Sequence, residues 1–361
     1  MLLKLLIRIL LVLTIVLVYN IYTNSSSEKN ELLTGMEQKV PKYLEELNQS
    51  TNELISTDER PTQGVSTFIG KTVEEWTKVY GKPSRIDPTP YGYEWWIYNQ
   101  DYKTYMQVGV EENTIVTIFV MGEEVDIFPY QIGQKVEDIY QFTFVETEHV
   151  VELPSGTYRF ELSEEDINTR PLIVLGDIYA QLYIDKFTST LSSVRFLNGK
   201  TLVKQHPYEM VYRGELLEAD PLTEEMWKKV ESGTEQQIFE LTNIIRQRFQ
   251  LDPLLWDEKT AEVAYNHSVD MYESDFFSHE SPESGTLFDR LKTADILFSL
   301  AGENIAAHYT DGPAVVEGWL NSKGHREIML NEDFTHIGVG VYQQYFTQNY
   351  ISKEWLNVGE R

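Results

Sequence analysis

Histidines crowd one part of this chain, and they are its side chains best suited to chemistry. Five of the seven lie between residues 267 and 336. Histidine transfers protons near neutral pH and binds metal ions through a neutral ring nitrogen. The same stretch carries a carboxylate, Glu303, between a glycine and an asparagine. We therefore expect a catalytic or binding site here, built from some of His267, His279, His308, His325 and His336.

Two of these histidines stand where a chain can present a side chain to a cleft. His279 follows a predicted helix in a segment rich in serine, proline and glycine, and loops often carry functional side chains. His325 follows Gly324, which allows a sharp turn. His267 shares a helix face with apolar residues four positions away on each side, so we expect it to be half-buried and hydrogen-bonded rather than a ligand. His308 is expected on a loop, and His336 on a strand bordering the cleft.

Glu303 has two interpretations. It either ties down a loop through backbone hydrogen bonds or orients a neighbouring imidazole. The sequence contains no H-E-x-x-H helix of a zinc peptidase and no G-x-S-x-G nucleophile elbow. The common hydrolase signatures are therefore missing.

Helices and strands must hold these side chains in place. Apolar residues recur at helical spacing in three segments and alternate as in strands in two others. Asp257 stands at an expected helix N-cap. We predict helices over 235–250, 257–277 and 313–321, and paired strands over 334–341 and 345–350.

The middle of the chain carries an internal repeat. The segment that starts at Ile69 resembles the one that starts at Ile132, and later tyrosine-rich stretches match as well. Each copy predicts a helix followed by about three antiparallel strands, and hence a pseudo-symmetric α+β domain. Trp95 and Trp96 either form a ligand platform or fill one face of the sheet, and we favour the sheet. Because no catalytic spacing is recognisable, we expect a binding or regulatory module.

The N-terminus predicts a membrane anchor. Lys4 and Arg8 accompany an apolar run that ends near Tyr22, and basic residues of this kind remain on the cytoplasmic side. No small-x-small cleavage site precedes Ser25. We expect an uncleaved single-pass helix in the cell membrane with the rest of the chain outside the cell. The alternative is a protein secreted after signal cleavage.

Composition excludes several classes of protein. The 361-residue chain has 57 Asp and Glu against 30 Lys and Arg, for a formal net charge of −27. Such a chain repels phosphate backbones, so we expect no nucleic-acid partner. It contains no cysteine, which excludes disulfides, thiol catalysis and cysteine-bound zinc.

The motifs of residues 235–351, about a third of the chain, resemble the CAP superfamily, the cysteine-rich secretory protein, antigen 5 and pathogenesis-related-1 group, in its bacterial form. The order of short motifs carries the resemblance: Asn266-His267-Ser268, Ser278-His279, Gly302-Glu303-Asn304, Gly324-His325-Arg326 and Gly338-Val339-Gly340. The duplicated part resembles the domain that accompanies CAP in membrane-anchored proteins of Gram-positive bacteria.

The resemblance implies an α-β-α sandwich with a cleft of two histidines and two glutamates that can hold a divalent metal such as zinc. Carried over, His279 and His325 match the imidazoles, and so the candidate zinc ligands, and Glu303 matches the first carboxylate. The second carboxylate falls near Ser322, where this sequence has no acid, and Glu317 is an off-register stand-in. The expected cleft therefore consists of His279, Glu303, Asn304, Ser322 and His325.

The predicted fold class is α+β, and three functions fit it. The first is a membrane-tethered extracellular module that binds a cell-envelope, lipid or protein ligand. The second is a metal-dependent hydrolase of peptide or envelope substrates with Glu303 as its candidate catalytic residue, and the third is a structural part of an envelope or spore assembly. The missing second carboxylate favours binding without catalysis. The predicted parts are a signal-anchor helix (1–23), a polar stalk (24–64), the duplicated domain (65–214), a connector (215–234) and the CAP sandwich (235–361).

Overall fold

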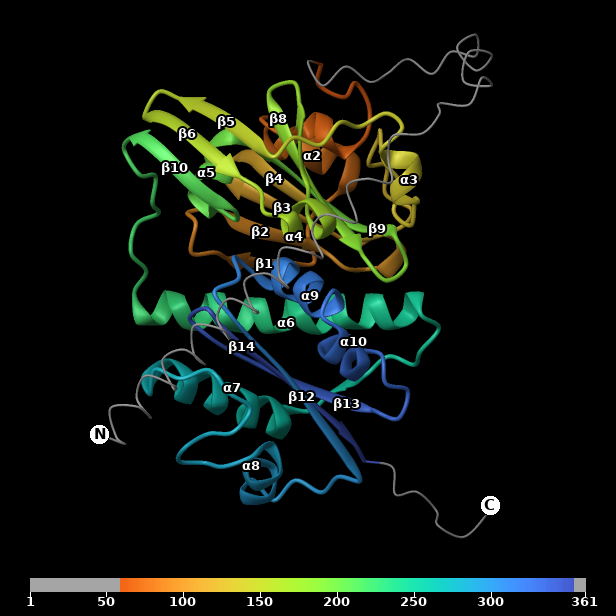
Figure 1. The fold of residues 1–361 in the computed structure, drawn as a ribbon, viewed down its shortest axis with the longest axis vertical. Helices are drawn as coiled ribbons and strands as arrows, with labels where there is room; N and C mark the ends of the chain where they lie inside the picture. Colours follow the sequence, from red (N-terminus) through yellow and green to blue (C-terminus); the bar gives the residue numbers. More distant parts are fainter. Residues whose placement is uncertain (1–58, 354–361) are drawn as a thin grey trace, which may run out of the picture. The chain divides into compact units, whose positions relative to one another are not determined.

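The computed structural model describes residues 59–353, which all belong to one compact unit, Leu54–Arg361 (Figure 1). The predicted signal-anchor helix and nearly all of the predicted stalk lie outside the described residues. Within 59–353, no helix is both long enough and apolar enough to cross a membrane. We call residues 59–214 the accessory domain and residues 224–353 the sandwich domain.

The accessory domain is built on a seven-stranded sheet in the order β1-β2-β3-β4-β9-β8-β7, with antiparallel neighbours throughout. Helix α2 begins at a capping box in which Thr72 and Glu75 each accept the other's backbone N–H. The elements are η3 (Val65–Phe68), α2 (Val73–Tyr80), β1 (Arg85–Pro88), β2 (Glu94–Tyr98), η4 (Tyr102–Thr104), β3 (Met106–Glu111), β4 (Thr114–Val120), α3 (Val136–Ile139), β7 (Leu172–Leu175), β8 (Ile178–Asp185) and β9 (Thr190–Asn198).

The two halves of this sheet share a pattern of backbone hydrogen bonds. In each half, a glycine with positive φ donates its N–H to a strand residue: Gly70 to the carbonyl of Ile115 (2.7 Å) and Gly133 to that of Leu191 (2.8 Å). The halves meet where β4 pairs with β9, so they form one continuous sheet. The duplication stays an inference from the sequence, which these matched bonds support.

A second, three-stranded sheet in the order β10-β6-β5 completes the accessory domain, and the sequence did not predict it. It packs around its own apolar cluster, which includes Tyr158 and Phe160. Its elements and the adjoining helices are β5 (Glu148–Leu153), β6 (Gly156–Glu161), α4 (Glu164–Thr169), α5 (Gly199–Gln205) and β10 (Glu209–Gly214).

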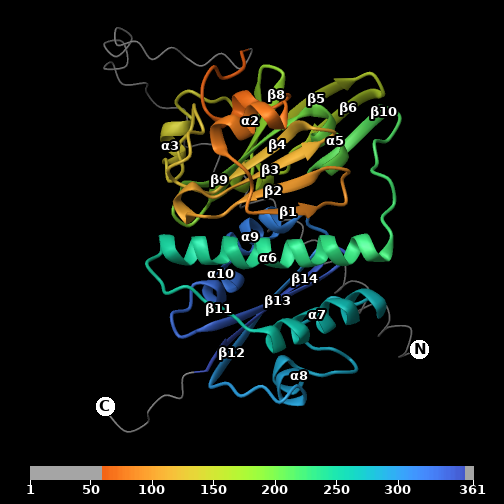
Figure 2. The ribbon, with the colours of Figure 1, turned by 180° about the vertical axis from the view of Figure 1, so that it is seen from behind.

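The sandwich domain has three layers. Its sheet has the order β11-β13-β14-β12, with β12 at one edge. Helices α6, α9 and α10 cover one face and α7 and α8 the other (Figures 1 and 2). Its elements are α6 (Glu224–Arg248), β11 (Leu255–Trp256), α7 (Glu258–Glu273), α8 (Leu287–Thr293), β12 (Leu300–Ala307), α9 (Gly312–Leu320), α10 (Lys323–Met329), β13 (His336–Tyr342) and β14 (Tyr345–Ser352). The predicted strand pair is present as antiparallel β13 and β14.

Two glycines of β13 allow α7 to lie directly on the sheet. A Cβ placed on Gly338 would lie 2.1 Å from the backbone nitrogen of Ala261, and one on Gly340 would lie 1.9 Å from that of Tyr265. Any side chain at either position would therefore push α7 away. Close packing explains the alternation of glycine with apolar residues in this strand.

Two predicted helix boundaries are wrong. Helix α6 begins at Glu224 rather than at 235, because Thr223 caps it by accepting the N–H of Met226. The predicted connector is therefore largely helical, and Gly233 continues the helix where a Cβ would lie 2.8 Å from Asp87. Helix α7 ends at Glu273 rather than at 277.

Gly324 does not form the predicted sharp turn. It lies in the first turn of α10, and it is not among the glycines with positive φ. His325 is therefore presented by a short helix. Helical geometry, rather than a flexible loop, sets the direction of its side chain.

The accessory and sandwich domains share one apolar core, although the sequence predicts separate units. Trp95 and Tyr105 of the accessory domain pack in the same cluster as Leu241 and Trp319 of the sandwich domain. Trp95 is thus a core residue, as we favoured. A buried ion pair between Arg195 and Asp311 crosses the same boundary.

Candidate functional site

His279 and Glu303 form the centre of the predicted site. His279 lies in the loop between α7 and α8, and Glu303 lies on the edge strand β12. The Nδ1 atom of His279 is 2.9 Å from Oε1 of Glu303. Because a carboxylate accepts hydrogen bonds, Nδ1 carries the proton in a neutral ring and Nε2 carries the lone pair. The carboxylate therefore orients this imidazole, which is one of the two roles expected for it.

A buried arginine holds the other oxygen of Glu303. Nη2 of Arg290, in α8, lies 2.5 Å from Oε2 of Glu303, and both side chains are almost fully buried. Arg290 Nη1 also donates to the carbonyls of His279 (3.0 Å) and Gly285 (2.9 Å). With its amide oriented to satisfy both neighbours, Asn349 donates to the same Oε2 at 2.9 Å. Glu303 is thus a fully paired carboxylate that ties the His279 loop to the sheet.

His267 lies behind this pair. Its side chain is fully buried on α7, and Nε2 is 3.0 Å from the carbonyl oxygen of Ser278 and 3.9 Å from Glu303. The prediction of a hydrogen-bonded residue is correct, but the prediction of half-burial is wrong. Burial lowers the pKa of His267 against the opposing effect of Glu303, which favours the neutral ring. The side chain supports the loop residue next to His279.

His325 approaches the same place from α10. Burial and, secondarily, the positive charge of a protonated His279 lower the pKa of His325. Nδ2 of Asn304 donates to the carbonyl oxygen of His325 at 3.2 Å, which links α10 to β12. The site therefore lies at the open edge of the sheet, between the loop after α7 and helix α10.

Glu317 faces the accessory domain and does not replace the missing carboxylate. Its Oε1 accepts hydrogen bonds from the hydroxyls of Ser192 (2.9 Å) and Ser193 (2.5 Å) on β9. Burial raises the pKa of Glu317 to about 7. Ser322 also lines the cavity between the two domains, together with Glu317. Positions 317 and 322, where a second acid was sought, thus both lie at the boundary between the two domains.

The remaining histidines of the cluster lie elsewhere. His308 follows β12 in a loop, where its ring packs edge-on against Tyr345. His336 begins β13, which β14 separates from β12, and its Nδ1 lies 2.8 Å from the hydroxyl of Thr335. Their partners in the described part of the chain thus differ from those of His279 and Glu303.

Zinc requires more ligands than the two imidazoles supply. Residues 59–353 contain no group of three or more histidine, cysteine, aspartate or glutamate side chains placed to hold a metal ion. His279 and Arg290 occupy the two oxygens of Glu303, which leaves two imidazoles. Structural zinc sites use four protein ligands and catalytic sites three. The described residues do not complete either set, and the assignment of zinc to His279 and His325 stays a prediction.

Arg290 and Asn349 are site residues that could not be identified from the sequence. Neither lies beside a histidine in the chain, and the fold brings them to Glu303 from α8 and β14. The only signal was physical: a buried carboxylate needs a cation or several donors. That requirement predicts a partner but not its position.

Comparisons with known proteins agree with this architecture. Residues 239–353 match the cysteine-rich secretory protein family, CAP, and residues 69–208 match the CAP-associated N-terminal domain. The chain belongs to the CAP family and carries the CAP-associated domain ahead of the CAP domain. The family assignment that the order of motifs suggested is thereby confirmed.

Particular relatives extend over most of the chain. The uncharacterized membrane protein YlbC of Bacillus subtilis (strain 168) is 49% identical over 310 residues, which are 85% of this chain and 89% of that protein. An extracellular protein containing a SCP domain from Bacillus anthracis is 48% identical, with a TM-score of 0.78 over 82% of this chain and 97% of that chain. A cysteine-rich secretory protein from Staphylococcus aureus is 29% identical, with a TM-score of 0.74 over the same shares.

Proposed function

We propose that this CAP protein is tethered to the outer face of the cell membrane and binds a component of the cell envelope. The binding cleft is formed by His279, Glu303 and His325, and it acts without hydrolysing its ligand. Asn304 and Arg290 hold its walls in place.

The pairing of Glu303 carries this proposal. A hydrolytic site needs a general base within hydrogen-bond reach of the group whose proton it removes. Here His279, Arg290 and Asn349 use the carboxylate oxygens of Glu303, so Glu303 is not free to act as that base. Nε2 of His279 is the remaining candidate base, and the sequence offers it neither a nucleophile elbow nor the zinc-binding helix of a peptidase. Binding requires only a cleft with a few convergent polar groups. The oriented Nε2 of His279 and the ring of His325 supply such groups.

The location rests on the N-terminal sequence and on relatives. Basic residues and an apolar run at the N-terminus are typical of an export signal or anchor. YlbC is named a membrane protein, and the Bacillus anthracis relative is described as extracellular. We infer a single-pass anchor with the described domains outside the cell.

Binding to two envelope preparations tests the proposal. Full-length protein and the double variant His279→Ala/His325→Ala would be incubated with insoluble cell-wall sacculi and, separately, with lipid vesicles. We expect the wild type to bind one of them and the double variant to bind it about tenfold more weakly or worse, or about 1.4 kcal/mol. His336→Ala, which lies outside the cleft, is the matched control and should bind as the wild type does.

Zinc content is measured on the same samples. If the two imidazoles hold zinc, full-length protein will take up the metal and the double variant will not. Equal binding of sacculi by wild type and double variant would contradict the proposed cleft and place the binding surface elsewhere. Because the proposed anchor inserts into lipid in both forms, vesicle binding supports the cleft only where the wild type exceeds the double variant.

A further inference from the structure

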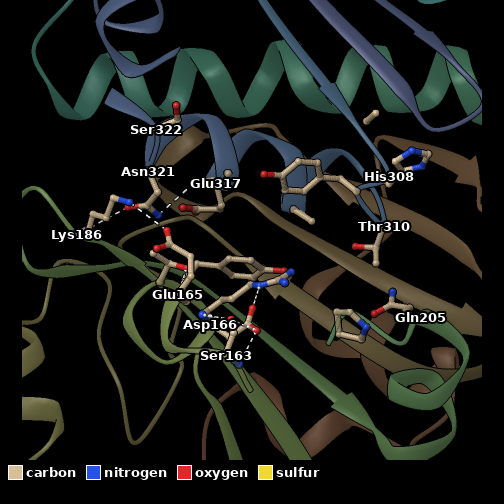
Figure 3. Close-up of a pocket in the computed structure, with 18 of the residues that line it drawn as sticks. Ser163, Glu165, Asp166, Lys186, Gln205, His308, Thr310, Glu317, Asn321 and Ser322 are labelled. Atoms are coloured by element: carbon tan, nitrogen blue, oxygen red, sulfur yellow. Dashed lines mark hydrogen bonds and ion pairs between the residues drawn. The ribbon is translucent and has the colours of Figure 1, made fainter. Parts of the chain in front are cut away.

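A cavity of about 1020 Å³ lies between the accessory and sandwich domains, and neither His279, Glu303 nor His325 lines it. Figure 3 shows Glu317 and Asn321 on one side of it and Glu165 and Asp166 on the other, with Lys186 next to Asn321, to which its backbone N–H donates (2.9 Å). Ligand sites occur preferentially at domain interfaces and have volumes of this order. The cavity is therefore large enough, and suitably placed, to be a second site.

The wall of this cavity carries charges of both signs. Its acids are Glu165, Asp166 and Glu317, of which Glu317 has a pKa raised to about 7, and its bases are Arg170, Lys186 and Lys323. Two of the acids are already paired: Lys186 Nζ lies 3.1 Å from Glu165, and Arg170 Nε lies 2.6 Å from Asp166. A strongly charged ligand would have to compete with these ion pairs. This mixture of signs favours a ligand without net charge.

Neutral groups and aromatic rings make up much of the remaining wall. Tyr91, Tyr183 and Tyr309 line the cavity from both domains, and Thr310 adds a hydroxyl-bearing side chain. Aromatic rings pack against the C–H faces of sugar rings, while hydroxyl and carboxyl groups hydrogen-bond with sugar hydroxyls. The wall therefore combines the two kinds of group that a sugar requires.

Glu317 supplies an unused carboxyl oxygen. Its side chain is only 2% exposed, and Ser192 and Ser193 donate to Oε1. Its Oε2 is buried and has no hydrogen-bond partner among the described residues. Leaving a buried polar atom unpaired is unfavourable, so such an atom points to a missing partner. Because Glu317 lines the cavity, a rotation of its side chain on binding would bring Oε2 to a hydroxyl group of the ligand, from which a carboxylate accepts and to which a protonated carboxyl group donates.

We propose that the cavity between the accessory and sandwich domains is a second binding site, for a neutral polyhydroxylated ligand such as a short oligosaccharide. The net charge of −27 disfavours anionic polymers at the same place. This proposal is independent of the cleft at His279, because the cavity shares none of the three residues that form that cleft.

Calorimetric titration with neutral, cationic and anionic probes tests the proposed sugar site. Full-length protein would be kept in a detergent without a sugar headgroup. The neutral probes are maltotriose and triacetylchitotriose, the cationic probe is the diamine cadaverine, and the anionic probe is glycerol phosphate. We expect one of the two neutral trisaccharides to bind, and the amine and the phosphate not to bind. Failure of both trisaccharides to bind folded wild-type protein would overturn the proposal, as would tighter binding of cadaverine than of either sugar.

Two variants locate the binding. Thr310→Trp fills the cavity without changing the backbone carbonyl that accepts from Tyr91, and Tyr309→Ala removes a ring from the wall. Each should weaken trisaccharide binding about tenfold or more. Unchanged binding in both folded variants would place the sugar elsewhere and contradict the proposal.

Two control variants test the charge of the ligand and the separation of this cavity from the cleft at His279. Glu317→Gln keeps a side-chain acceptor and adds a donor, so a sugar should still bind within about threefold, or about 0.65 kcal/mol. Loss of all trisaccharide binding in that variant would show that a charge is required and would contradict a neutral ligand. His279→Ala/His325→Ala should leave trisaccharide binding unchanged, and loss of binding there would show that the two sites are one.

Discussion

Arg290 holds both Glu303 and the loop of His279 in place. It neutralises the buried Glu303 and holds two carbonyls of the loop that carries His279. Removing one partner of a buried ion pair leaves an uncompensated charge, which costs about 3–5 kcal/mol. We therefore expect Arg290→Ala to lower the free energy of unfolding by an amount of this order in denaturant titration.

Arg159→Ala is the matched control for that variant. Arg159 pairs with Glu161 on β6, where both side chains are more than two-fifths exposed (46% and 43%). Exposed pairs contribute about 0–1 kcal/mol, so this change should be nearly neutral. If the two arginine variants were destabilised equally, the pairing of Glu303 with Arg290 would contribute no more than a surface ion pair.

Glu317 makes the stability of the protein depend on pH. Burial raises its folded-state pKa from 4.5 to about 7. Because the folded state holds this proton more tightly than the unfolded state, the contribution is complete below pH 4.5 and is lost as the pH rises to about 7. Glu235, whose pKa burial also raises to about 7, acts in the same direction.

The free energy of unfolding would be measured between about pH 4 and pH 8. This range includes the pKa of Glu317 in the unfolded state and in the folded state. Glu317→Gln should remove from the wild-type profile a loss of stability on the order of 3 kcal/mol. The lowered pKa values of His267 and His325 act in the opposite direction, so the difference between wild type and variant is the quantity to compare. A variant with the same pH profile as the wild type would mean that Glu317 does not hold its proton in the folded state.

At the scale of single elements, β13 gives the sharpest prediction. Gly340→Ala forces a Cβ to within 1.9 Å of the α7 backbone, and overpacking of this kind costs about 1–3 kcal/mol or more. Gly324→Ala is the control, because it lies in α10 with no heavy atom within 4 Å of its Cβ position. It should be neutral or stabilising by up to about 1 kcal/mol. Thermal unfolding of both variants decides this, and equal melting temperatures would contradict the packing of α7 on β13.

The helices and strands of the sandwich domain were predicted from the sequence to different extents. Strands β13 and β14 were predictable because β-branched and aromatic residues recur in them at a period of two, although both faces of these strands are buried. Helix α6 was predicted too short, from 235 instead of 224, because Gly233 suggested an interruption although tertiary contact with Asp87 explains it. His279 and Glu303 were identified by motif order. Arg290 was not, since a partner brought in by folding leaves no local pattern.

At the scale of the whole molecule, the two domains depend on each other. Arg195 of β9 is fully buried and pairs with Asp311 at 2.7 Å, and Arg326 of α10 makes two hydrogen bonds to Asp185 (3.0 and 2.9 Å). Apolar residues of both domains fill one core. Separating the domains would expose this core and leave buried charges unpaired.

A truncated chain tests this dependence. Residues 224–361 alone should melt at a lower temperature than the full chain, or aggregate, because the face that packs against Trp95 and Tyr105 is then exposed. Light scattering and thermal unfolding would show this. A monomeric fragment as stable as the full chain would contradict the shared core.

The central claim is that the cleft of His279, Glu303 and His325 binds an envelope component without cleaving it. The most direct measurement follows the release of soluble fragments from labelled cell walls and labelled peptides by full-length protein, with and without added zinc. Binding to the same material is recorded in parallel, and Glu303→Gln is carried beside the wild type. We predict that wild-type binding saturates while fragment release stays at the level of buffer alone. Zinc-dependent release that disappears in Glu303→Gln would contradict this claim and assign a hydrolase activity to the cleft.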